Sequence, residues 1–198
     1  MIKALVVDFG GVLAEEGFRE GLKAIARNEG LDPEEFFPLA RDLIYDSGYV
    51  TGKADEHTYW ENIRLKTKVR NDDNELRREI LGRFVLRPGM FEEIKRVRAR
   101  GVTVALLSDQ TDWLDELNRK EPFYHYFDRL FNSFALKKSK RDASLFRDVT
   151  KELGLAPEEI FFVDDSPENV DRAKAQGWKT LRFTNEEDFK KALKEENI

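Results

Sequence analysis

Short apolar runs recur along the chain, and each is bounded by glycine, serine or acidic residues. Four such runs stand out, at Ala4 to Val7, Val102 to Leu107, Ile160 to Val163 and Leu181 to Phe183. Continuous apolar runs of this length are typical of strands buried on both faces of a sheet. We therefore predict four strands at these places.

Amphipathic segments come between the later runs and end at residues that stop helices. The predicted helices are Phe91 to Arg100, Leu145 to Leu153 and Pro167 to Gln176, and a glycine follows each of them. Glycine directly after a helix is a common termination signal. Strands that alternate with helices predict a parallel sheet covered on both faces. We therefore expect an α/β protein with a three-layer, Rossmann-like core.

The segment from residue 15 to 84 has a different pattern, with helical periodicity and no buried strand. Its predicted helices are Phe18 to Asn28, Pro33 to Tyr45, Asp55 to Thr67 and Asp73 to Phe84. Asp32 before Pro33 is a favourable N-cap followed by a proline at the first helical position. We expect a helical bundle inserted after the first strand. The predicted domains are therefore a core of residues 1–14 and 85–198 and an inserted domain of residues 15–84.

Composition narrows the class of protein and its compartment. The 198 residues include 37% charged side chains, a net charge of −5 and no cysteine. The absence of a basic patch argues against a nucleic-acid partner, and the absence of cysteine excludes disulfides and thiolate metal sites. The apolar start of the chain is too short for a signal peptide, and no run has the length of a transmembrane helix. We expect a cytoplasmic protein with no membrane partner, and the oligomeric state stays open.

Polar residues follow three of the predicted strands directly. They are Asp8 after the first strand, Ser108 and Asp109 after the second, and Asp164 and Asp165 after the third. In an open parallel sheet, ligands bind at the carboxyl ends of the strands. Each of these residues alone is an ordinary turn or cap residue, but their order along the chain favours a shared site. Lys140, in the loop before helix 145–153, is a candidate fourth contributor.

Four segments of the chain resemble the haloacid-dehalogenase-like (HAD) superfamily, in the branch with a helical cap. They are Asp8 to Leu13, Leu106 to Ser108, Lys140 to Ala143 and Phe162 to Asn169. The resemblance implies that the inserted helical domain is a cap that closes over small substrates. It also implies that Asp8 is a covalent nucleophile and that the metal is held by Asp8, the Gly10 carbonyl and Asp165.

The resemblance assigns the remaining residues to the transferred group. Ser108 and the backbone at Asp109 would hold the phosphoryl oxygens, and Lys140 would add a positive charge beside the nucleophile. Asp164 is a possible auxiliary residue. Two carboxylates about 4 Å apart repel by roughly 4 kcal/mol at an effective dielectric constant near 20. A hard cation offsets this repulsion, and Mg²⁺ suits few carboxylates combined with water and phosphate.

Gly10 departs from the pattern of the phosphatases in this superfamily. They usually carry an aspartate there, two residues after the nucleophile, as general acid and base. Glycine still offers its backbone carbonyl to a metal, but it has no side chain that can transfer a proton. General acid or base catalysis by such a side chain typically raises the rate by about 10²–10⁴-fold. Relatives with a similar Asp-x-Gly segment, resembling a sugar-1-phosphatase branch, are nevertheless phosphatases. Asp164 is the one substitute acid or base that the sequence suggests.

The function that fits these residues is hydrolysis of a small phosphorylated metabolite with Mg²⁺, through an aspartyl-phosphate on Asp8. Two alternatives stay open at this point. The same aspartate could hydrolyse a carbon–halogen bond, as in a 2-haloacid dehalogenase. That reaction needs no Mg²⁺, so the pair Asp164 and Asp165 favours the phosphatase. The chain could also be a phospho-ligand binding protein of low turnover, although a binder gains nothing from a nucleophile at Asp8.

Overall fold

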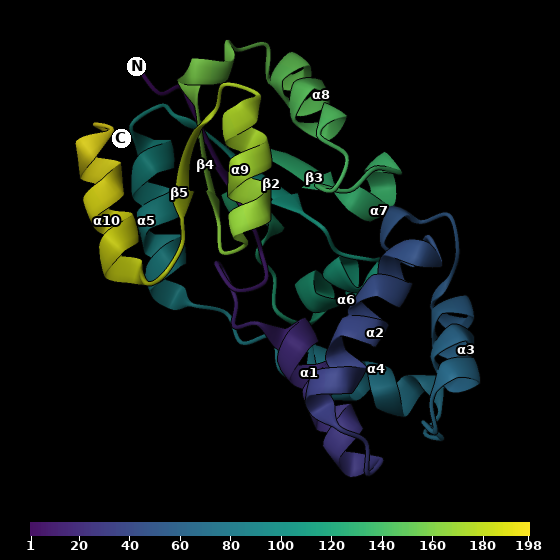
Figure 1. The fold of residues 1–198 in the computed structure, drawn as a ribbon. Helices are drawn as coiled ribbons and strands as arrows, with labels where there is room; N and C mark the ends of the chain where they lie inside the picture. The colour runs from purple at the N-terminus through teal and green to yellow at the C-terminus, as the bar shows by residue number, and fades with distance from the viewer.

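Five parallel strands form one sheet at the centre of the computed structural model, which describes all residues from 1 to 198 (Figure 1). The strands are β1 (Ala4–Val7), β2 (Thr103–Ser108), β3 (Arg129–Asn132), β4 (Ile160–Asp164) and β5 (Lys179–Arg182). Their order across the sheet is β3-β2-β1-β4-β5, so β1 is central. Val7 is in register with Leu106 on one side and Val163 on the other. The residues that follow these three positions therefore lie side by side at the carboxyl ends of the strands, along one edge of the sheet.

Ten α-helices surround or extend from the sheet. They are α1 (Gly17–Asn28), α2 (Pro33–Asp46), α3 (Glu56–Lys66), α4 (Asp73–Leu81), α5 (Pro88–Ala99), α6 (Trp113–Lys120), α7 (Ser133–Leu136), α8 (Ser144–Leu153), α9 (Pro167–Ala175) and α10 (Glu186–Glu195). Three short 3₁₀ turns, η1 (Tyr49–Thr51), η2 (Tyr124–Tyr126) and η3 (Pro157–Glu159), complete the chain. None of the helices combines the length and the apolar composition that crossing a bilayer requires.

Alternate residues of the central strands pack into two separate apolar clusters, one on each face of the sheet. Leu5 and Val7 of β1 pack into the larger cluster, which also takes the apolar side chains of α5 and α10. Ala4 and Val6 face the opposite way, into a smaller cluster shared with α8 and α9. The strands β1, β2 and β4 are therefore buried on both faces, which is why their sequences are largely apolar, whereas β3 and β5 are partly exposed. The predicted three-layer α/β fold is confirmed.

The helices α1–α4 pack on one another beside the core, as Figure 1 shows. The backbones of α1 and α4 approach so closely at Gly21 that a Cβ atom there would lie 2.6 Å from Ile80 Cα. Asp32 caps α2 by accepting hydrogen bonds from the amides of Glu34 and Glu35 at 2.7 and 3.4 Å. The predicted cap and the four predicted helices are present, but α4 ends at Leu81 with Gly82 as its C-cap rather than at Phe84.

Two adjacent segments connect α1–α4 to the sheet. The amide of Glu15 donates to the Val85 carbonyl at 2.9 Å, and the amide of Arg87 donates to the Leu13 carbonyl at 2.8 Å. The Arg87 guanidinium also donates to both carboxylate oxygens of Glu15, at 3.2 and 3.0 Å. The chain thus leaves and re-enters the core through one paired crossing near residues 14 and 85.

Aromatic side chains join the helical segment to the core at a second place. Tyr49 and Trp60 of the helical segment pack against Trp113 of α6, with ring centroids 5.6 and 6.2 Å apart. The Tyr49 hydroxyl donates to Asp112 at 2.5 Å. Tyr49 and Trp60, and with them Tyr59, are fully buried. These three residues therefore belong to the packed interior rather than to a surface that contacts ligands.

Candidate active site

Asp8 lies directly after the central strand and is held by both neighbouring elements. Its amide donates to the Val163 carbonyl at 2.9 Å, which extends the β1–β4 ladder by one residue. Its Oδ1 atom accepts the amide of Phe9 at 2.8 Å and lies 2.8 Å from Lys140 Nζ. Oδ2 takes part in no hydrogen bond within the protein. One oxygen is therefore anchored, while the other is free for a ligand or for attack.

Lys140 is buried, with only 1% of the residue exposed, and it contacts three carboxylates. Its Nζ atom donates to Asp164 Oδ2 at 2.6 Å as well as contacting Asp8. Its backbone amide donates to Asp109 Oδ1 at 2.8 Å. A single buried cation therefore offsets the charge of carboxylates that come from three different strand ends.

Asp164 is fully buried, and both of its carboxylate oxygens are occupied. Oδ2 accepts from Lys140, and Oδ1 accepts the amide of Ser166 at 2.9 Å. The side-chain amide of Asn169 lies 3.2 and 3.3 Å from the two oxygens. This carboxylate therefore acts as a fixed acceptor that positions Lys140 and the turn into α9.

Asp165 is half-buried and lies against the glycine turn that follows Asp8. Gly11 adopts a φ of +77°, and a Cβ atom placed on it would lie 2.5 Å from Asp165 Oδ2. Only glycine fits both the backbone conformation and this close approach. The turn therefore leaves space for the Asp165 carboxylate to approach Asp8.

These contacts create an acidic cluster suited to a hard cation. One carboxylate oxygen each of Asp8, Asp164 and Asp165 lies within 4.8 Å of the others. Asp8 and Asp165 have oxygens without protein hydrogen bonds, whereas Asp164 has none to spare. Few protein carboxylates combined with room for water and phosphate match the preference of Mg²⁺. The donor set thus fits the expected metal at Asp8 and Asp165.

Burial and mutual repulsion shift the pKa values of the cluster. Burial raises the pKa of Asp8 well above its usual value, Lys140 opposes this shift, and Asp164 and Asp165 add to it. Burial likewise raises the pKa of Asp165, and Asp164 reinforces the effect. Burial alone would lower the pKa of Lys140, but the charges of Asp164, Asp8 and Asp109 together raise it. The lysine therefore stays protonated while excess negative charge favours cation binding.

Ser108 and Asp109 occupy the end of β2 beside Asp8, but they have different surroundings. The buried Ser108 hydroxyl makes no hydrogen bond within the protein and is available to a ligand. The Asp109 carboxylate is instead engaged by the Lys140 amide and by the Tyr45 hydroxyl, at 2.8 and 3.1 Å. Its side chain therefore links α2 to the site, and only its backbone is free to meet a substrate.

The structure adds residues that the sequence analysis left out of the site. Tyr45 reaches Asp109 from α2, and Arg141 packs over the Tyr45 ring with the guanidinium carbon 3.5 Å from its centroid. Asn169 supports Asp164 from α9. Glu16, eight positions after Asp8, lies close to Gly10, since a Cβ atom on Gly10 would be 4.0 Å from its Oε2. Glu16 and Tyr45 come from the helical segment, which has no strand pattern, whereas Arg141 and Asn169 lie within the segments Lys140 to Ala143 and Phe162 to Asn169 but had no predicted role.

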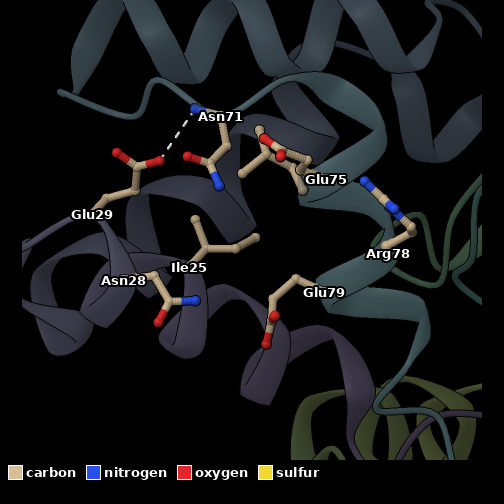
Figure 2. Close-up of a pocket in the computed structure, with 8 residues that line it drawn as sticks. Ile25, Asn28, Glu29, Asn71, Glu75, Arg78 and Glu79 are labelled. Carbon is tan, nitrogen blue, oxygen red and sulfur yellow. Dashed lines mark hydrogen bonds between the residues drawn. The ribbon is translucent and has the colours of Figure 1, made fainter.

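A separate hollow lies within the helical segment. It has a volume of about 350 Å³ and is lined mainly by polar side chains of α1, α4 and the loop before α4. Figure 2 shows Glu29, Glu75 and Glu79 around it. The backbone amide of Asn71 donates to the Glu29 carboxylate at 3.2 Å. None of the residues at the strand ends lines this hollow, and nothing in it identifies a ligand.

Curated relatives of the chain include two phosphatases. The enolase-phosphatase E1 of Aquifex aeolicus is 25% identical over 94% of this chain and 92% of its own length. A phosphorylated carbohydrates phosphatase of Thermotoga maritima is 23% identical over 89% of this chain and 82% of its own length.

Solved structures and a family profile agree with these relatives. A HAD family enzyme from Bacteroides thetaiotaomicron has a TM-score of 0.74 and 26% identity, over 92% of this chain and 94% of that one. A structure of that enzyme in complex with magnesium and inorganic phosphate has a TM-score of 0.73 at 24% identity, over 93% and 95% of the two chains. Residues 2–177 match the profile of haloacid dehalogenase-like hydrolases. The chain therefore belongs to the haloacid dehalogenase-like hydrolase family.

Proposed function

We propose that this hydrolase is a Mg²⁺-dependent phosphomonoesterase that forms an aspartyl-phosphate on Asp8. The main support for this proposal is the different environment of the two oxygens of the Asp8 carboxylate. Its Oδ1 is anchored by Lys140 and Phe9, its Oδ2 is free, and Asp165 lies in the same cluster. A nucleophile oriented in this way is suited to in-line attack on phosphorus.

Each side chain at the strand ends has a proposed role in that reaction. Asp8 attacks phosphorus while Lys140 neutralises charge on the phosphoryl oxygens, and Ser108 with the backbone of Asp109 orients them. Asp8, Asp165 and the Gly10 carbonyl are proposed to hold Mg²⁺. When bound, the metal supplies positive charge that allows a phosphate dianion to approach the carboxylates.

The domain division supports a small-molecule substrate. We propose that residues 1–14 and 85–198 form the catalytic core, and that residues 15–84 form a cap over it. The paired crossing near residues 14 and 85 and the separate packing of α1–α4 support this division. Because Tyr45 of α2 reaches Asp109, the cap contributes to the wall of the site. A small phosphate ester suits a site enclosed by such a cap.

The two alternative functions have less support. A 2-haloacid dehalogenase does not need the negative charge of Asp165 beside Asp8, which costs free energy without a cation. A protein that only binds phosphate would be expected to avoid a carboxylate directed at its ligand. The phosphatase relatives and the magnesium and phosphate complex of the structural relative also favour phosphate ester hydrolysis.

Release of inorganic phosphate from a panel of phosphate esters tests the proposal directly. We expect turnover with Mg²⁺, loss of turnover in EDTA, and no chloride release from 2-chloropropionate. Chloride release that persists in EDTA would establish the dehalogenase instead. Tight phosphate binding without turnover of any ester would establish the binding protein.

A further inference from the structure

Hydrolysis of an alkyl phosphate needs a proton donor for the leaving oxygen, and Gly10 has no side chain to supply one. This requirement rests on the proposed function. The other carboxylates at the strand ends are already engaged. Asp8 is the nucleophile, Asp165 faces the proposed cation, and both oxygens of Asp164 accept hydrogen bonds. Asp109 accepts from the Lys140 amide and from Tyr45.

Glu16 is the remaining carboxylate near the start of the Asp8 turn. A Cβ atom built on Gly10 would lie 4.0 Å from Glu16 Oε2, and its nearest neighbour would be Phe84 Cε1 at 3.4 Å. The carboxylate of Glu16 therefore lies next to the space that a longer side chain at position 10 would enter. The half-buried Glu16 belongs to the segment that links the core to α1, at the junction of core and cap.

The two oxygens of Glu16 have different surroundings. Oε1 accepts the amide of Arg19 at 3.2 Å and thereby caps the N-terminus of α1. Oε2 makes no hydrogen bond within the protein. The cap interaction fixes the direction of the carboxylate and leaves its second oxygen free on the side of Gly10. A side chain with this arrangement is oriented before substrate binds.

We infer that Glu16 is the general acid and base of the hydrolase, supplied from the start of the cap instead of from position 10. In the first step, Asp8 forms a bond to phosphorus and the ester P–O bond breaks. The leaving oxygen takes the electron pair and a proton from Glu16. In the second step, Glu16 takes a proton from water as the water oxygen attacks phosphorus. The bond from phosphorus to Asp8 breaks, so inorganic phosphate leaves and both side chains return to their starting states.

Leaving groups of different basicity separate proton donation from a structural role. Glu16→Gln keeps an oxygen that can cap α1 but removes the transferable proton. With saturating Mg²⁺, we expect release of glycerol from glycerol phosphate in a single turnover to fall by about 10²–10⁴-fold. Release of nitrophenolate from p-nitrophenyl phosphate should be nearly unchanged in the same measurement, because that anion leaves without a proton. Glu20→Gln, an exposed substitution in the same helical turn, should alter neither rate.

A second variant places the missing carboxyl where Gly10 stands. Gly10 does not adopt a positive φ, and its Cβ would make only ordinary contacts. Gly10→Asp in the Glu16→Gln background should therefore restore much of the glycerol release. Equal losses on both esters, or full glycerol release without Glu16, would overturn the assignment. Wild-type turnover of p-nitrophenyl phosphate tests the proposed function separately, and its absence would overturn both.

Discussion

At the scale of single residues, the site depends on one buried cation among several carboxylates. Lys140 contacts Asp8 and Asp164 through Nζ and binds Asp109 through its amide. Removing one partner of a buried ion pair leaves the other charge without compensation, which is strongly destabilising. The lysine therefore stabilises the fold as well as the proposed transition state.

Lys140→Met tests that dual role. The variant should lose phosphatase activity, and its free energy of unfolding should fall by about 3–5 kcal/mol. Lys138→Met is a matched control, since Lys138 pairs with Asp148 at the surface. Its effect on unfolding should be about 0–1 kcal/mol. Urea unfolding of both variants measures the difference, and equal stabilities would contradict the account of Lys140.

Asp8 and Asp165 are the proposed metal ligands, so we expect a bound cation to stabilise the protein through this cluster. Binding to the folded state alone stabilises a protein by about 2.7 kcal/mol when the ligand is at about 100 times its Kd. We therefore expect Mg²⁺ to raise the Tm by several degrees relative to EDTA. Asp165→Asn should remove this shift, whereas Asp171→Asn, on the exposed side of α9, should retain it. A shift that survives in Asp165→Asn would show that the metal binds elsewhere.

At the scale of elements, buried strands and capped helices were predictable from the sequence. The runs that became β1, β2 and β4 are apolar because both faces of each strand are covered. The edge strand β3 was missed because its sequence, Arg-Leu-Phe-Asn, is partly exposed and carries a charge. The helices α6, α7 and α10 were also not predicted. The strand ends predicted the candidate site, whereas the proposed contributions of Glu16 and Tyr45 depend on tertiary packing that the sequence pattern does not indicate.

Helix α2 meets the core through Tyr45, which offers a test of the cap. Tyr45→Phe removes the hydrogen bond to Asp109 but keeps the ring that packs on Arg141. We expect a changed ranking of substrates, measured as kcat/KM on a panel of phosphate esters, with unchanged dependence on Mg²⁺. Loss of Mg²⁺ dependence in this variant would contradict the assignment of residues 15–84 as a cap. An unchanged ranking would show that Tyr45 does not contact the substrate.

Helices α3 and α4 are joined by an exposed pair that responds to pH. His57 Nδ1 lies 2.9 Å from Asp73, and this contact raises the pKa of His57 above its usual value. A group whose pKa is raised by folding stabilises the protein below its unfolded pKa, and the contribution is lost as pH rises through its folded pKa. His57→Gln should therefore lower the Tm near pH 5.5 but not near pH 9, since histidine titrates between these values. An equal loss at both values would contradict this explanation.

At the scale of the whole molecule, the fold brings together groups that are far apart in sequence. The parallel sheet places Asp8, Ser108 and Asp164 at one edge, and the loop before α8 adds Lys140. The helical segment lies beside the same edge of the sheet. Glu16 at its start and Tyr45 of α2 both lie near the strand ends. The core and the helical segment are thus both proposed to take part in the chemistry, and the helical segment also in the choice of substrate.

Detection of a phosphorylated Asp8 is a direct test of covalent catalysis by this residue. The protein is mixed with p-nitrophenyl phosphate and Mg²⁺, quenched in acid within the first turnover and analysed by mass spectrometry of its peptides. We predict one phosphoryl group on the peptide that contains Asp8. We also predict more of this adduct in Glu16→Gln, which hydrolyses it slowly, and none in Asp8→Asn. Turnover by Asp8→Asn, or turnover by the wild type with no adduct on Asp8 in either protein, would contradict covalent catalysis by this residue.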